Sequence, residues 1–261
     1  MPDKRGLRLV YLPVSPWSER ARWALDHHGV AYRWVVHRLY LDERGLRRRA
    51  RVAPGERASV PLFVEGDTIL RDSIDILKHA DVVGRGTKLV EDPRALDALV
   101  AMFEPGLQAM RGRVTAGTIE SSACIREHGA EVVPAFMAGL LAPVVVRAAR
   151  FIGDKYGAVL ERDGQNLETI RATLRAARSR IDTTRVPDAR SLRAEHILLA
   201  TFLQGIRPVT APHIKLGPAS RAVWTCEPLL EEAADLLAWR DAVYASARSL
   251  PVRSRAPRSS G

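Results

Sequence analysis

The sequence contains very little cysteine. Its two cysteines, Cys124 and Cys226, lie far apart, and neither belongs to a C-x-x-C pair or a histidine-rich cluster. Disulfide-stapled folds and zinc modules need several cysteines at close, regular spacings, so neither class is indicated. No other spacing points to a metal. The sequence therefore predicts a metal-free protein of a reducing cytoplasm.

Apolar runs long enough for a membrane are also missing. One charge-free stretch, Val132 to Val146, has 15 residues and contains two prolines and a glycine. A membrane-spanning helix needs ~20 apolar residues. The N-terminus runs into a strand-like segment and lacks the apolar region of a signal peptide. We interpret the stretch as buried helices and expect no membrane partner.

Lysine is scarce, although the chain is strongly basic. Only five of its 40 Lys and Arg residues are lysine, and the formal net charge is +10. Such a charge suits a nucleic acid or another anionic surface. The arginines are spread along the chain, however, which is typical of a general preference for arginine. We expect no nucleic-acid partner.

Residues 7–83 alternate the patterns of strands and helices. Pro16 opens a helical pattern that Gly29 closes. Residues 65–67, with a central glycine between two short apolar runs, are typical of a hairpin turn. The order of strand, helix, strand, helix, two strands and helix predicts a small α/β domain.

From about residue 92 the pattern is helical. Asp92 and Pro93 are typical of a helix start, and apolar residues then recur at helical spacing. Pro105 should kink or end that helix, because proline lacks the N–H that an inner turn needs. The patterns divide the chain into an α/β domain (1–83), a linker (84–91), an all-helical domain (92–246) with an extra segment around 111–156, and a disordered basic tail (247–261).

Three local motifs stand in the N-terminal half: S-P-W-S-E-R-A-R-W-A-L at 15–25, V-P-L at 60–62 and D-S at 72–73. In this order and at these spacings they resemble the glutathione S-transferase family. The first is similar to the helix start of its tau and omega classes, with serine where omega proteins have cysteine. The resemblance implies a thioredoxin-like α/β N-terminal domain, an all-α C-terminal domain and a homodimer.

The resemblance makes Ser15 the catalytic residue that holds glutathione as its thiolate. A free thiol with a pKa of about 8.5 is only a few per cent ionised at pH 7. Lowering that pKa by ~2 units takes ~2.7 kcal/mol. A hydroxyl donor beside a helix N-terminus can supply much of this. From local spacing alone, a plain N-cap explains Ser15 equally well. Ser18 is the weaker candidate, because inside the helix its hydroxyl favours backbone partners.

The resemblance also assigns glutathione-binding residues: Trp17, Val60, Pro61, Asp72 and Ser73. Val60, before a proline that is cis in the family, would pair its backbone with the peptide-like ligand. Asp72 and Ser73 would hold the γ-glutamyl end, helped by the helix N-terminus. An ordinary helix cap would account for the same pair.

Two positions depart from the family pattern. Ser59 stands where a basic residue is common, so the contact to the glycine carboxylate is open. Three residues remain for it: His37, Arg38 and Arg57. In the helical half, the capping box that begins at Ser191 has its acid one residue late, at Glu195.

The second substrate should bind between the domains, beside the helix that follows Asp92 and near Trp17. Four residues are candidates for this electrophile pocket: Met102, Phe103, Met110 and Arg111. Aromatic and methionine residues at helical spacing are more often part of a core.

The resemblance implies a cytoplasmic glutathione transferase with glutathione as co-substrate and a small electrophile as the second substrate. A serine at position 15 argues against a glutathione-dependent thiol reductase, which needs a protein thiol. Two alternatives stay open. One is a glutathione-dependent isomerase, as in the family's zeta class, and the other is a non-catalytic binding module with an arginine-rich surface.

Overall fold

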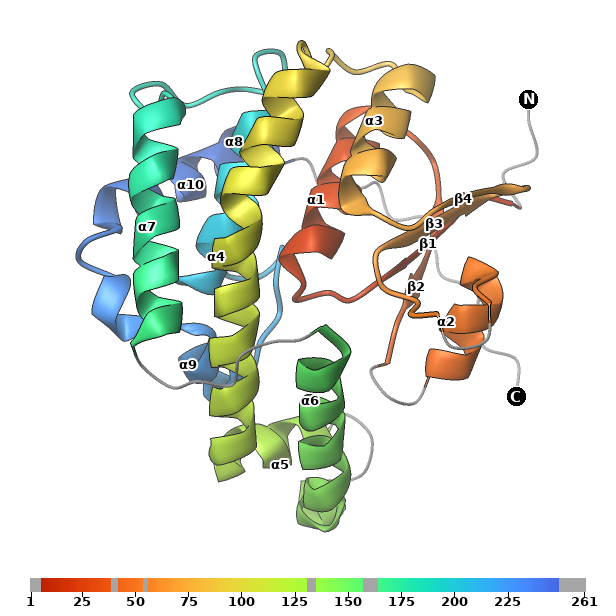
Figure 1. The fold of residues 1–261 in the computed structure, drawn as a ribbon, viewed down its shortest axis with the longest axis vertical. Coiled ribbons are helices and arrows are strands. Elements are labelled where there is room, and N and C mark those ends of the chain that lie inside the picture. The colour runs from red at the N-terminus through yellow and green to blue at the C-terminus, as the bar shows by residue number, and fades with distance from the viewer. Residues whose placement is uncertain (1–5, 39–41, 54–55, 131–134, 157–163, 249–261) are drawn as a thin grey trace. The chain divides into compact units, whose positions relative to one another are not determined.

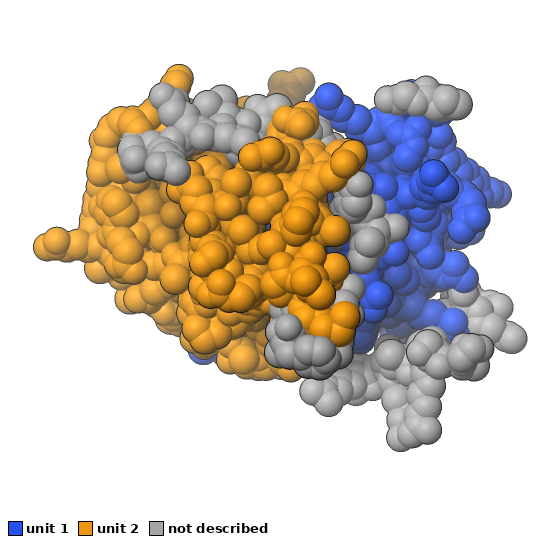
Figure 2. All heavy atoms as spheres, turned by 90° about the horizontal axis from the view of Figure 1, so that it is seen from below, with its two compact units in different colours: residues 1–91, 187–197, 243–261 blue, residues 92–186, 198–242 orange. Residues whose placement is uncertain are grey.

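The computed structural model describes residues 6–38, 42–53, 56–130, 135–156 and 164–248 (Figure 1). The chain divides into two compact units, coloured separately in Figure 2. Unit 1 comprises residues 1–91, 187–197 and 243–261, and unit 2 comprises residues 92–186 and 198–242. Each unit is therefore assembled from segments that lie far apart in the sequence.

Unit 1 contains a four-stranded sheet in the order β2-β1-β3-β4. Its strands are β1 (Arg8–Tyr11), β2 (Arg33–Val36), β3 (Leu62–Glu65) and β4 (Thr68–Leu70). β1 pairs parallel with β2 and antiparallel with β3, and β3 pairs antiparallel with β4. Gly66, with a φ of +57°, supplies the left-handed residue of the hairpin between β3 and β4. The predicted α/β order is confirmed.

Helices cover both faces of this sheet. α1 (Pro16–His27) and α3 (Ser73–Val83) pack together on one face, and α2 (Glu43–Ala50) lies on the other (Figure 1). Side chains alternate along a strand, so neighbouring residues of β1 serve different faces. Val10 and Leu62 pack with Leu46 and Ala50 of α2 in one buried cluster.

The segment predicted as a linker, 84–91, belongs to unit 1 and is held against the end of α1. The backbone N–H of Arg85 donates to the carbonyl of His28 at 3.0 Å. A Cβ on Gly86 would lie 2.6 Å from the carbonyl oxygen of His27. A glycine is required here because the two backbones approach so closely.

The C-terminal end of unit 1 corrects the predicted tail. α10 (Ala234–Ala247) ends on Ala247, and Arg248 is buried, with its guanidinium 2.8 Å from the carboxylate of Glu19. Both residues were assigned to a disordered tail. No local pattern identifies the partner of Arg248, because Glu19 lies 229 residues away in the sequence. Residues 249–261 of the expected tail lie outside the described residues.

The start of α8 (Ala194–Phe202) is capped in an unexpected way. Ser191 exchanges hydrogen bonds with Asp188, whose carboxylate accepts from the Ser191 hydroxyl at 2.7 Å. The side chain that reaches back to the helix start belongs to His196, whose Nδ1 accepts from the backbone N–H of Arg193 at 3.0 Å. The imidazole thus takes the place of the expected acidic residue.

Unit 2 is helical. Its helices are α4 (Pro93–Glu120), α5 (Ser122–Ala130), α6 (Ala142–Tyr156), α7 (Gln165–Arg180) and α9 (Pro218–Trp224), with three short 3₁₀ helices at Ala135–Leu141, Leu203–Gly205 and Glu227–Leu229. α8 and α10 contribute residues to both units. α4 packs along α7, and Phe103 and Phe202 meet with ring centroids 5.2 Å apart.

Pro105 does not end α4, which continues to Glu120. The next residue, Gly106, is buried, and a Cβ there would lie 2.6 Å from Oγ1 of Thr173 on α7. Proline removes one backbone hydrogen bond of the helix, and tertiary packing of this kind compensates for that loss.

The extra segment around 111–156 comprises the end of α4, α5, a 3₁₀ helix and α6. The charge-free stretch within it is helical over its described part, residues 135–146, as expected. Its predicted burial is wrong for four side chains: Met137, Leu140, Pro143 and Val144 are exposed, Leu140 by 74%. Residues 131–134 lie outside the described residues.

No helix in the described part of the chain combines the length and the apolar character needed to cross a membrane. Over the same residues, no group of three or more His, Cys, Asp or Glu side chains is placed to hold a metal ion.

Candidate functional site

The three sequence motifs meet at one end of the sheet of unit 1. β1 and β3 are antiparallel, with Val10 opposite Leu62, so the chain leaves β1 and enters β3 at the same edge. β4 returns antiparallel to β3, with Leu70 opposite Phe63, and its exit reaches that edge too. The start of α1, the turn at 60–62 and the start of α3 therefore lie together.

Ser15 is the N-cap of α1. Its Oγ accepts from the backbone N–H of Ser18 at 3.3 Å, and its carbonyl accepts from the N–H of Glu19 at 2.9 Å. Pro16 follows at a position that needs no N–H. A hydroxyl can accept and donate at once, and no described residue accepts the proton of Ser15. That proton is available to an anion at the positive end of the helix.

Ser18 is turned toward the protein backbone. It is fully buried, and its Oγ accepts from the backbone N–H of Leu12 at 3.1 Å. This bond ties α1 to the segment that follows β1. Both serine hydroxyls thus accept a backbone N–H, but Ser18 is fully buried, whereas Ser15 is 8% exposed at the helix start.

Asp72 and Ser73 have different roles at the start of α3. Asp72 is the N-cap, and its carboxylate accepts from the backbone N–H of Ile74 at 2.6 Å. Ser73 is 1% exposed, and its Oγ has no hydrogen-bond partner among the described residues. A buried hydroxyl without a partner is costly for the folded state. Its position at a helix N-terminus fits an anionic ligand group such as a carboxylate.

The turn before β3 has the geometry that the family resemblance implies. The Val60–Pro61 peptide bond is cis, Pro61 is buried, and the half-buried Val60 packs against the cluster beneath α2. Trp17, in the first turn of α1, is half-buried. Contacts of these three residues with glutathione stay a prediction.

The three candidates for the glycine carboxylate differ in exposure. His37 is buried, with its Nε2 3.4 Å from a carboxylate oxygen of Glu43 on α2. Arg38 and Arg57 are exposed. His37 therefore belongs to the packing of α2, and the two guanidinium groups are the better placed to meet a carboxylate from solvent.

The four candidates for an electrophile pocket lie on α4 in unit 2, and two of them are core residues. Phe103 is fully buried, and Met110 is 3% exposed. A Cβ on Gly205 would lie 2.1 Å from the sulfur of Met110, which shows how closely that side chain is packed. Met102 is partly exposed, and Arg111 donates to Gln108 at 2.7 Å. A role in electrophile binding stays a prediction for all four.

One charged residue near this site was missed from the sequence. Arg248 was assigned to the tail, yet it binds two carboxylates of α1, the helix that Ser15 caps. Only its position directly after an apolar helical pattern could have suggested burial, and that signal is weak for an arginine.

Comparison with known proteins agrees with the geometry of unit 1. Residues 9–82 match the family model for the glutathione S-transferase N-terminal domain. Residues 9–82 are therefore an N-terminal domain of the glutathione S-transferase family. No curated protein matches the chain.

Solved structures extend the likeness in fold to most of the chain. A glutathione transferase from Phanerochaete chrysosporium is 12% identical, with a TM-score of 0.58 over 91% of this chain and 96% of its own. A glutathione transferase Omega 3C from Trametes versicolor is 13% identical, with a TM-score of 0.46 over 94% and 90% of the two chains. A maleylacetoacetate isomerase from Methylobacterium extorquens AM1, solved with malonate and glutathione, is 21% identical, with a TM-score of 0.42 over 90% and 96%. The first likeness shows that the chain has the fold of a glutathione transferase.

Proposed function

We propose that this protein is a glutathione transferase, which activates the glutathione thiol for addition to, or substitution on, a small electrophile. One observation carries the proposal: three motifs from separate segments of residues 15–73 gather at one end of the sheet. Two of them place a serine at a helix N-terminus. Among the described residues, the hydroxyl of Ser15 has no acceptor for its proton, and the hydroxyl of Ser73 has no hydrogen-bond partner.

In this proposal the two helix starts bind different parts of glutathione. Ser15 donates its hydroxyl proton to the thiolate, and the positive end of α1 adds to the stabilisation. Ser73 and the start of α3 receive the γ-glutamyl carboxylate, while the exposed carboxylate of Asp72 suits the ammonium group. Val60 would offer its backbone to the cysteinyl part of the ligand.

The test uses two variants of Ser15. Ser15→Ala removes both the cap and the proton donor, whereas Ser15→Asp keeps a good N-cap but replaces the donor with a negative charge. We expect both variants to lose activity by about 100-fold or more, as for other lost oxyanion donors. Only Ser15→Ala should also lose about 1 kcal/mol of stability.

Activity is measured on a panel of haloarenes, epoxides, enones and disulfides after a calorimetric titration of glutathione. Equal activity of the unmutated protein and both variants would overturn the role of Ser15. No binding of glutathione would overturn the enzyme assignment and favour a binding module with the same fold. Turnover of a substrate without consumption of glutathione would favour an isomerase.

We also propose that the protein is a cytoplasmic homodimer. Light scattering coupled to size-exclusion chromatography gives the mass directly, against 28.8 kDa for one chain. A single species at the monomer mass would contradict the dimer and leave the proposal for glutathione unchanged.

A further inference from the structure

The side chain of Arg248 bridges two turns of α1 inside unit 1. Its guanidinium donates to Glu19 and to Asp26, each at 2.8 Å, and all three side chains are at most 4% exposed. The guanidinium also lies over the ring of Trp23, 5.6 Å from its centroid. A buried arginine with two carboxylate partners is a specific arrangement, because each charge would be costly alone.

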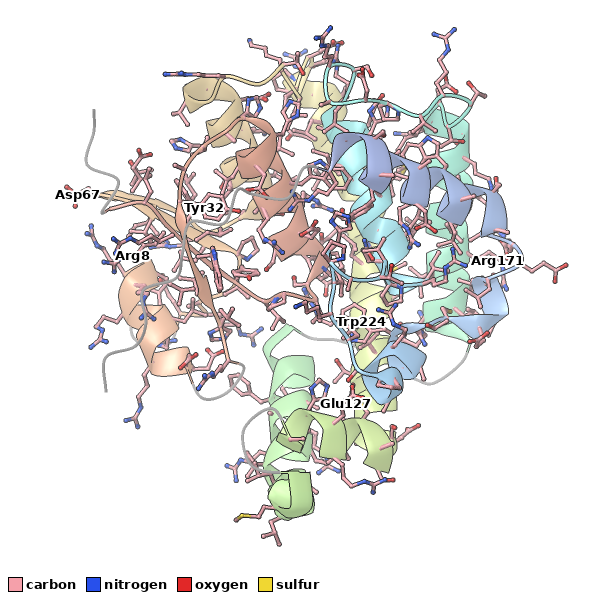
Figure 3. All side chains as sticks on the ribbon, turned by 180° about the vertical axis from the view of Figure 1, so that it is seen from behind. Arg8, Tyr32, Asp67, Glu127, Arg171 and Trp224 are labelled. Atoms are coloured by element: carbon pink, nitrogen blue, oxygen red, sulfur yellow. The ribbon has the colours of Figure 1, made fainter. Side chains whose placement is uncertain are left out.

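Other polar groups complete this buried cluster. Arg22 lies 3.2 Å from Glu19 and stacks over the ring of Tyr11. Tyr32, labelled in Figure 3, donates its hydroxyl to Asp26 at 2.9 Å. The charged and titratable groups that act within this cluster include Arg22, Tyr11, Tyr32 and Tyr244 beside Glu19, Asp26 and Arg248.

The balance of charge in the cluster depends on Arg248. Burial alone would lower the pKa of its guanidinium, but Glu19 and Asp26 outweigh that effect and raise the pKa. Burial raises the pKa of Asp26, although Arg248 and the Tyr32 hydroxyl act in the opposite direction. Without Arg248, Glu19 would keep its ion pair with Arg22, and Asp26 would keep its hydrogen bond from the Tyr32 hydroxyl.

The two carboxylates lie at different distances from the site. Glu19 is one turn after Ser15 and donates its backbone N–H to the Ser15 carbonyl at 2.9 Å. Along an α-helix, Glu19 is about 6 Å from Ser15, whereas Asp26 is about 16 Å away. A negative charge at the nearer position opposes a thiolate at the helix start much more strongly.

We propose that Arg248 is a positioning residue for the glutathione site: it neutralises Glu19 and so keeps the start of α1 able to hold a thiolate. The residue that follows α10 thereby influences chemistry at a residue more than 200 positions earlier in the chain. The inference rests on the proposed function, because it concerns the thiol that Ser15 is proposed to hold.

The test compares three variants of the full chain: Arg248→Met, Arg248→Met with Glu19→Gln, and Arg248→Met with Asp26→Asn. The pKa of bound glutathione is read from the ultraviolet absorbance of the thiolate and from the acid limb of the pH profile of kcat/KM. We expect Arg248→Met to raise this pKa by about one unit, as a nearby uncompensated charge does.

The two double variants separate charge from structure. Each removes one of the two carboxylates that lose Arg248, so both should recover a similar part of the melting temperature lost in Arg248→Met. Only the variant with Glu19→Gln should return the thiol pKa to its original value. If Arg248→Met does not fold, the thiol pKa values of the two double variants still show whether the charge of Glu19 affects the thiol.

Three results would overturn the inference. In the first, the thiol pKa is unchanged in Arg248→Met although glutathione binds. In the second, the two double variants have the same thiol pKa, which would make Arg248 a purely structural residue. In the third, the unmutated chain does not bind glutathione at all, and this result alone would overturn the proposed function as well.

Discussion

At the scale of single residues, a substitution at Ser73 should affect glutathione binding and protein stability differently. Its hydroxyl is buried at the start of α3 without a partner among the described residues. Ser73→Ala should therefore leave stability unchanged or slightly higher, because it removes an unpaired polar group. The affinity for glutathione should fall by roughly 10- to 100-fold, the loss expected for a hydrogen bond to a carboxylate. Calorimetry and urea unfolding measure the two effects.

Ser246 provides the matched control for this prediction. Its hydroxyl donates to the carbonyl of Pro187 at 2.7 Å, also within unit 1. Ser246→Ala should lose about 1 kcal/mol of stability and keep its affinity for glutathione. The idea that Ser73 is reserved for a ligand is refuted if Ser73→Ala loses stability and retains full affinity.

Two helical glycines should respond to alanine with opposite signs. At Gly106 a Cβ would lie 2.6 Å from Oγ1 of Thr173 and 2.7 Å from a ring carbon of Phe202. Overpacking of this kind costs about 1–3 kcal/mol, which exceeds the gain of up to about 1 kcal/mol from replacing glycine in a helix. Gly106→Ala should therefore destabilise unit 2.

Gly45, within α2, is the control. A Cβ there would meet only the mobile end of Arg49, at 3.0 Å. Gly45→Ala should raise the free energy of unfolding by about 0.5–1 kcal/mol. Denaturant unfolding of both variants tests the pair, and a stabilised Gly106→Ala would show that the close packing of α4 on α7 is wrong.

At the scale of elements, α9 depends on a cap from another helix. Its N-cap, Gly217, has no side chain to offer. The carboxylate of Glu127 on α5 accepts from the backbone N–H groups of Ala219 and Ser220, each at 3.0 Å (labelled in Figure 3). The amide of glutamine has one oxygen and can replace only part of this cap. Glu127→Gln should therefore lower the free energy of unfolding by about 1 kcal/mol at neutral pH.

The effect of Glu127→Gln should depend on pH. Burial would raise the pKa of Glu127, but hydrogen bonds from Ser220 and Ala219 outweigh it and lower the pKa below its ordinary value of 4.5. A carboxyl with a lowered folded-state pKa contributes its stability above the unfolded value and loses it as the pH falls through the folded value. The difference between the variant and the unmutated protein should thus be full above about pH 5 and shrink in more acidic solution.

Urea unfolding at several pH values measures this difference. Glu231→Gln, at an exposed carboxylate of the same unit, is the control and should cost nothing measurable. A cost of Glu127→Gln that stays constant into strong acid would show that the carboxylate does not act as the cap of α9.

Local patterns predicted most elements of unit 1, because the interactions that start and end these elements have a short range along the chain. Caps such as Asp72 and turns such as Gly66 act within a few residues, so the sequence shows them directly. α4 is different, since the packing of Gly106 on α7 maintains it beyond Pro105. The local pattern of α2 is weaker, because its Arg-rich sequence shows only a narrow apolar side around Leu46.

At the scale of the whole molecule, the two units should respond differently to glutathione. All the proposed glutathione-binding residues lie in unit 1. A ligand present at a hundred times its Kd stabilises the state that binds it by about 2.7 kcal/mol. If the units unfold in separate steps, only the step of unit 1 should move, by roughly 5–10 °C.

Scanning calorimetry with and without glutathione checks this expectation, and Ser73→Ala should abolish the shift. Glutathione disulfide, which has no free thiol, is a useful comparison, because it tests whether binding needs the thiol. A shift confined to the step of unit 2 would contradict the placement of the site in unit 1.

The sequence alone determined the α/β pattern of residues 7–83, the helical pattern that follows, and three motifs in a recognisable order. These features depend on neighbours within one or two turns of chain. Only the tertiary structure decided that the motifs share one end of the sheet, that Ser73 is buried without a partner, and that Arg248 is paired with Glu19 and Asp26. Burial and ion pairing are set by residues up to 229 positions away, and no local pattern encodes such a partner.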